Sequence, residues 1–295
     1  MVEMVFKKMR PVIATFSLGV LFVMMAAIPA LGQIEFSPTI LMMSKDDPVQ
    51  QLLISNMTNT PKEVEFVERF GYPVHSESGT LEMVYDDSIS GRNYGLSGML
   101  RIFPRKLLLP AGARQVVRVY VGHNEAAKEQ MYWTRLGIES KAVQPAFEDV
   151  SATNGVADND SMVVSTLFRQ HIGVYYKHGS VQTGVTLNDT EILYDRDEIA
   201  LLISASRTGN SPFLGIMTVR LTGRNGRVVH ESERVVSLFF DDTISVLIDR
   251  DDVPPGFYTM DVSFETARGD LSDEELIKSP RQQFATELII QGQTH

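Results

Sequence analysis

Apolar and polar residues alternate along most of this chain, and no long stretch places apolar residues at helical spacing. In the first half, the alternating stretches that predict strands cover residues 34–43, 49–56, 63–70, 100–103, 115–121, 132–139 and 162–176. Turn signals such as Asn59-Thr60-Pro61 and Pro110-Ala111-Gly112 separate them. Seven short strands at this spacing predict an immunoglobulin-like β-sandwich.

A second series of alternating stretches follows residues 177–184, whose glycines and polar residues are typical of a hinge between domains. It predicts strands over residues 198–206, 215–221, 227–240, 243–248, 258–264 and 283–291, and only 270–277 favours a short helix. Asn225-Gly226 signals a hairpin, and Tyr258 is placed like a tyrosine corner. The predicted fold class is all-β, with two immunoglobulin-like β-sandwich domains over residues 33–180 and 181–295.

Two segments interrupt this rhythm of strands. Residues 74–98 are rich in serine, glycine and aspartate, which indicates a surface excursion. Residues 142–161 form a long polar loop. Loops of that length in compact domains are usually functional or disordered.

The first 32 residues have the layout of a signal peptide. Lys7, Lys8 and Arg10 precede an apolar core, and small residues lie before Gln33, which we expect to be the first mature residue. Cleavage there indicates export. The alternative is an uncleaved membrane anchor, because the apolar run is close to the roughly 20 residues that span a bilayer. No later stretch is long and apolar enough to span a membrane.

Composition narrows the possible partners and chemistry. The chain has 37 acidic and 27 basic residues and a formal charge of -10, and removal of the signal peptide makes this charge more negative. An acidic protein is a poor partner for nucleic acid or an anionic membrane surface. The absence of cysteine excludes disulfides and thiolate metal sites, so stability must come from buried apolar cores.

The sequence contains few features that indicate an enzyme. Its histidines lack metal-binding spacing, and nucleophile elbows and phosphate-binding glycine motifs are missing, so we expect no catalytic residue, cofactor or metal. Acidic clusters at 195–198, 241–242 and 249–252 have the oxygen ligands that calcium prefers, but their position at turns favours solvated surface. Trp133 is expected to pack in or beside a core, with stacking on a sugar as the alternative.

Several short segments of the first half together resemble the PapD-like periplasmic chaperones of pilus assembly. The matching segments are 34–39 (IEFSPT), 51–56 (QLLISN), 102–104 (IFP), 109–112 (LPAG), 115–119 (QVVRV) and 131–136 (MYWTRL). Their order and spacing carry the resemblance, which covers residues 34–177. The second domain does not match the family's patterns, so we regard it as a divergent sandwich.

The resemblance implies a two-domain, boomerang-shaped periplasmic protein that binds pilus or surface subunits lacking a strand. In that family the last strand of the first domain is lent to the protein client, and an outer-membrane usher is a second candidate partner. The residues offered to the client would be Met162, Val164, Thr166 and Phe168. Ile172, Val174 and Tyr176 would belong to the chain's own core. The alternative is that all seven pack within their own domain.

Two further family features can be placed on this sequence. The family holds the client's C-terminal carboxylate with an arginine on the first strand and a lysine on the last. By register these positions fall at Ile40 and Gly173, or at His171 if the register shifts by two. None of these residues matches, which leaves Arg169 and Lys177 as candidate substitutes.

An interdomain salt bridge is the other feature that the resemblance implies. Glu129 and Lys177 fall at its positions, with Asp195 or Asp197 as a third member. The leading hypothesis is thus a chaperone that donates an edge strand. A structural or adhesive cell-envelope protein without a chaperone cycle is the alternative, and a carbohydrate-binding or calcium-dependent module is a third class.

Overall fold

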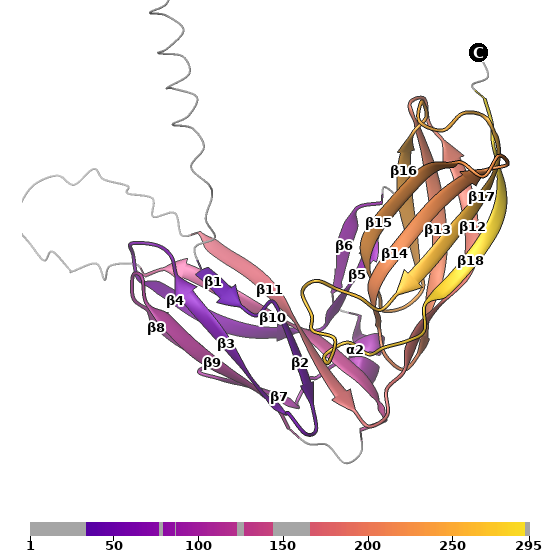
Figure 1. Ribbon diagram of the computed structural model, residues 1–295. Coiled ribbons are helices and arrows are strands. Elements are labelled where there is room, and N and C mark those ends of the chain that lie inside the picture. Colours follow the sequence, from indigo (N-terminus) through magenta and orange to yellow (C-terminus); the bar gives the residue numbers. More distant parts are fainter. Residues whose placement is uncertain (1–33, 77–78, 86, 123–126, 144–165, 293–295) are drawn as a thin grey trace, which may run out of the picture.

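The computed structural model describes residues 34–76, 79–85, 87–122, 127–143 and 166–292. The expected signal peptide, most of the polar loop, Met162 and Val164 lie outside these ranges. Strands form two β-sandwiches that lie at an angle to each other (Figure 1). The all-β fold predicted from alternation is confirmed. In the described part of the chain, no helix is long and apolar enough to cross a membrane.

The first sandwich packs a four-stranded sheet against a five-stranded sheet. The four-stranded sheet has the order β1 (Ile34–Ser37), β3 (Val49–Asn56), β9 (Arg114–Val121) and β7 (Leu100–Phe103). The five-stranded sheet has the order β2 (Ile40–Ser44), β11 (Leu167–His178), β10 (Gln130–Ala142), β4 (Lys62–Arg69) and β8 (Lys106–Leu109). Alternate side chains such as Leu52, Phe66 and Val117 are fully buried between the sheets, as the period-two pattern requires.

The second sandwich has a separate core, which includes Ile203, Val219 and Phe264. One sheet has the order β12 (Thr183–Tyr194), β13 (Glu198–Gly209) and β16 (Asp242–Asp249). The other has the order β15 (Val228–Leu238), β14 (Phe213–Gly223), β17 (Gly256–Glu265) and β18 (Gln282–Ile290). The hairpin at Asn225-Gly226 is confirmed by the pairing of β14 with β15. The tyrosine corner is also confirmed, since the Tyr258 hydroxyl donates to the Pro254 carbonyl at 2.6 Å.

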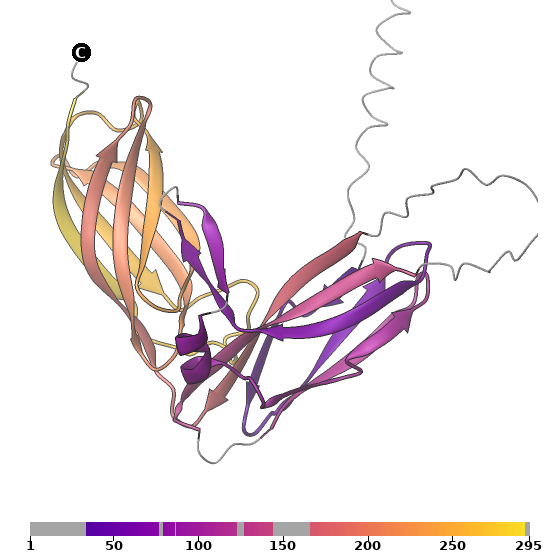
Figure 2. The ribbon, with the colours of Figure 1, turned by 180° about the vertical axis from the view of Figure 1, so that it is seen from behind.

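The composition of residues 74–98 suggests a surface excursion, and in the structure this region contains most of a β-hairpin and a short helix. β5 (Gly71–His75) pairs antiparallel with β6 (Leu81–Tyr85), and α2 (Ser88–Tyr94) follows. The Asp87 carboxylate caps this helix by accepting hydrogen bonds from two backbone amides of its first turn. The hairpin extends from the first sandwich to the second (Figure 2).

The two sandwiches meet in a third apolar cluster. Trp133 lies at its centre and is 1% exposed, which agrees with the packing role expected for it. The other buried members from the two halves are Met131, Tyr175, Leu214, Phe239, Leu271 and Leu276. The short helix expected over 270–277 is not formed: this segment consists of turns that bring Leu271 and Leu276 into the cluster.

Candidate functional site

β11 is paired along only part of one side. It pairs with β10 over its whole length, but with β2 only over residues 173–177. Within the described part of the chain, residues 167–172 have no neighbouring strand on the β2 side. We call this segment the open edge. It ends where the Gly173 amide donates to the Thr39 carbonyl at 3.2 Å.

The backbone groups that face outward from the open edge follow from the hydrogen bond of Gly173. Successive residues of a strand direct their amides to opposite sides, so residues two and four before Gly173 share its direction. The amides of His171 and Arg169 therefore point away from β10, toward the side on which none of the described strands pairs with them. Backbone groups at a sheet edge are a template for another strand.

Side chains along β11 change from buried to exposed toward the open edge. Ile172, Val174 and Tyr176 belong to the first core, as the sequence predicts. Phe168 lies on the same face by alternation but is 40% exposed, while Leu167 on the opposite face is 52% exposed. Thr166 precedes the strand and is also exposed. The open edge thus combines a backbone that no described strand pairs with on the β2 side and an accessible apolar side chain.

The positions expected for a carboxylate anchor meet at the inner end of the open edge. Ile40 and Gly173 are direct partners in the β2–β11 ladder, and Gly173 is also opposite Arg135 of β10. Arg135 is in turn opposite Arg69 of β4. Side chains directly opposite one another lie on the same face of a sheet, so this row brings two arginines onto one face.

Arg135 extends over the position where Gly173 lacks a side chain. A Cβ atom on Gly173 would lie 3.2 Å from Arg135 Nη1 and 2.8 Å from the Tyr175 ring, so glycine leaves room for the guanidinium. Arg135 Nε is buried and has no hydrogen-bond partner among the residues described. Neither Ile40 nor Gly173 carries a charge. The positive charge at this end of the open edge therefore comes from Arg135 on β10. The sequence alone gives little reason to select Arg135 as a site residue, because its position matters only when the pairing with Gly173 is known.

His171 lies on the open edge close to this row. Its ring centroid is 5.5 Å from that of Tyr85, and the Arg69 guanidinium carbon lies 4.4 Å above the Tyr85 ring. Burial lowers the pKa of His171, and the positive charges of Arg169 and Arg135 lower this pKa further. The lowered pKa favours the neutral form of His171 beside these arginines.

The two candidate substitutes for the anchor are placed differently. Arg169 Nε lies 2.6 Å from Glu139 Oε1, so its charge is already paired across β10 and β11. Lys177 lies near the C-terminal end of β11, opposite Met131 and Ser44. Arg135 is therefore the cation that lies beside Gly173.

Glu129 connects the two sandwiches through backbone groups. Among the ion pairs of the described residues, none joins Glu129 to Lys177. The Glu129 carbonyl instead accepts a hydrogen bond from Asn210 Nδ2 at 2.7 Å, and the Met131 amide donates to the Asn210 carbonyl at 3.0 Å. Asn210 thus fills the linking role that the salt bridge was expected to have.

Asp195 and Asp197 belong to the turn between β12 and β13. Their carbonyls accept hydrogen bonds from Arg250, at 2.8 Å from its Nη1 and 3.0 Å from its amide. Both aspartates therefore contribute to a turn within the second sandwich. Among the described residues, no group of three or more histidines, aspartates or glutamates could hold a metal ion.

Comparisons with known proteins give matches in structure alone. No family model and no curated protein matches the sequence of this chain. The YadV chaperone is similar with a TM-score of 0.45 and 10% identity, over 86% of this chain and 100% of that one. The CupB2 chaperone of Pseudomonas aeruginosa has a TM-score of 0.39 and 10% identity, over 86% and 100%. The class 5 fimbriae chaperone CfaA has a TM-score of 0.40 and 13% identity, over 86% and 98%.

Proposed function

We propose that this chain is a non-enzymatic periplasmic chaperone that binds and caps a strand-deficient pilus or surface-fibre subunit. The open edge of β11 carries this proposal, because no described strand pairs with residues 167–172 on the β2 side and Phe168 is exposed there. Addition of a strand gains affinity from main-chain hydrogen bonds and specificity from alternate side chains. A client that lacks a strand exposes its own edge, and capping that edge prevents aggregation.

The position of Arg135 supports a direction for the added strand. β2 runs parallel to β11 and blocks further pairing from Gly173 onward. A client strand parallel to β11 would bring its C-terminal carboxylate to this end, where the Arg135 guanidinium can form a charge-assisted hydrogen bond. An antiparallel strand would bring its ammonium group there and be repelled. We therefore include in the proposal that Arg135 holds the client's C-terminus.

The proposal also includes three features that rest on the sequence. Residues 1–32 are removed on export, the two domains cover residues 33–180 and 181–295, and an outer-membrane usher is a second partner. A structural or adhesive cell-envelope protein is the competing function. It would present the same two sandwiches without holding a client, so recovery of a bound subunit distinguishes the two.

Phe168 and Leu167 form a matched pair for testing this function. Both are exposed at the same end of β11, but they lie on opposite faces. We expect Phe168→Asp to abolish co-purification of small exported subunits encoded beside the gene. Leu167→Asp should retain the subunits, because its side chain faces away from the side that the client's core would occupy. Equal recovery with both variants would exclude strand donation through this face.

A further inference from the structure

We infer that the β5–β6 hairpin is a brace that fixes the second sandwich relative to the first. The hairpin begins directly after β4 of the first sandwich. It lies beside β16 and β15 of the second, as both views of the molecule show (Figures 1 and 2). It therefore adds a further connection between two sandwiches that also meet in the apolar cluster around Trp133. This inference does not depend on client binding.

The base of the hairpin is attached through aromatic side chains. The ring of Tyr72 on β5 meets that of Phe240 edge to face, with centroids 4.8 Å apart, and lies 6.1 Å from that of Phe239. The Tyr72 hydroxyl donates to the Asp87 carboxylate at 3.0 Å, which ties the hairpin to α2. This attachment is continuous with the apolar cluster around Trp133.

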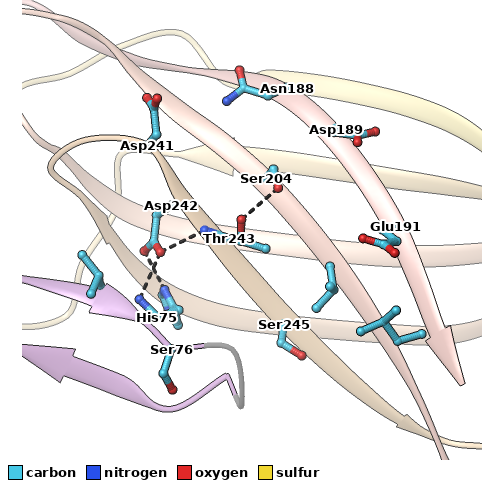
Figure 3. A pocket seen from close by; sticks show the side chains of 13 residues that line it. His75, Ser76, Asn188, Asp189, Glu191, Ser204, Asp241, Asp242, Thr243 and Ser245 are labelled. Atoms are coloured by element: carbon cyan, nitrogen blue, oxygen red, sulfur yellow. Dashed lines mark hydrogen bonds and ion pairs between the residues drawn. The ribbon is translucent and has the colours of Figure 1, made fainter. Parts of the chain in front are cut away.

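A second attachment lies nearer the tip of the hairpin. The His75 amide donates to Asp242 Oδ1 at 3.0 Å, and His75 Nδ1 lies 2.7 Å from Asp242 Oδ2 (Figure 3). Both side chains are largely buried, at 11% and 7% exposure. Gly79 adds a close contact, since a Cβ atom there would lie 3.0 Å from Ser245 Cβ.

Two separated attachments restrict motion more than one attachment can. A single contact near the covalent connection permits rotation about that contact, whereas a second contact away from it removes this rotation. An open cavity of about 790 Å³ borders the His75–Asp242 pair and is lined by residues such as Glu191, Leu202 and Ser204. Packing is thus incomplete around the outer attachment, so we expect its rigidity to depend on this pair.

Distance measurements between spin labels can test the brace. The natural chain contains no cysteine, so Gln51→Cys and Glu287→Cys place one label on an exposed strand of each sandwich. We expect one narrow distance distribution by double electron–electron resonance in this background. His75→Ala and Asp242→Asn should each cause loss of the narrow peak. Arg220→Ala is the control, because Arg220 pairs with Glu231 within the second sandwich, at 2.6 Å.

An exchange variant and a measurement of folding complete this test. The exchange variant with both His75→Asp and Asp242→His should recover part of the narrow peak, because it restores a pair of the same chemical types. Circular dichroism of each variant should match that of the parent, which separates local release from unfolding. An unchanged distribution in folded His75→Ala and Asp242→Asn, or equal broadening in Arg220→Ala, would overturn the inference.

Discussion

Arg135 is the residue that determines the direction of a bound strand in this account. Its Nε is buried without a hydrogen-bond partner among the described residues, and Gly173 leaves space for its guanidinium beside the open edge. A carboxylate brought beside Gly173 would form a charge-assisted hydrogen bond with the Arg135 guanidinium. A hydrogen bond to a charged group contributes about 1.5–3 kcal/mol.

Replacement of Arg135 by glutamine should therefore weaken binding of a peptide that matches the client's C-terminal strand. We expect a rise in Kd of about 10- to 100-fold, measured by calorimetry, since about 1.4 kcal/mol corresponds to a factor of ten. The same peptide with an amidated C-terminus should bind both proteins alike. Arg169→Gln is the control, because Arg169 is paired with Glu139. A similar loss with the amidated peptide would contradict carboxylate recognition.

The lowered pKa of His171 predicts how the free energy of unfolding depends on pH. Its pKa is lowered in the folded protein, mainly by burial, from the usual value near 6.5. As pH falls through that value, the unfolded chain takes up a proton that the folded chain resists, so the free energy of unfolding decreases. His171→Gln should reduce this loss, measured as the difference between urea unfolding at pH 7.5 and at pH 5.5. An identical pH difference in the variant and the parent would contradict the assignment.

At the scale of the element, the open edge can be tested through its backbone. The amide of residue 169 points away from β10, whereas that of Gln170 points toward it. Proline has no amide hydrogen and is tolerated at strand edges where that amide faces solvent. Arg169→Pro should thus prevent client binding with a small change in unfolding temperature. Arg169→Ala should bind, since it removes the side chain and keeps the amide. Binding by folded Arg169→Pro would exclude pairing at this position.

Alternation in the sequence predicts many strands, but not the elements that depend on distant partners. The resemblance to the chaperone family places the two anchor positions at Ile40 and Gly173, and the structure pairs these residues directly. β5 and β6 are missed because Pro73 and nearby serines indicate a loop, while the ring that Tyr72 packs against comes from Phe240 of the other half. β12 is missed, since a bulge between Leu187 and Asp189 interrupts its alternation.

At the scale of the whole molecule, the candidate site depends on residues that no local pattern unites. Arg69, Arg135 and Gly173 are brought into one row by three strands. The adjacent part of the same face carries Trp133 and Tyr175, which pack against the second sandwich. The second sandwich thus covers one end of this face and leaves the open edge accessible. The resemblance in sequence implies that the last strand of the first domain is lent to a client, and this stays a prediction. The sequence does not indicate Arg135 beside that strand, because the position of Arg135 depends on register across the sheet.

The central claim is that a client strand pairs with the open edge of β11. Amide hydrogen exchange of the free protein and of its complex with a client tests this claim directly. We predict that the amides of Arg169 and His171 exchange rapidly in the free protein and become protected in the complex, while Gln170 is protected in both by β10. Unchanged exchange at Arg169 and His171 in a complex that is fully formed would contradict the account.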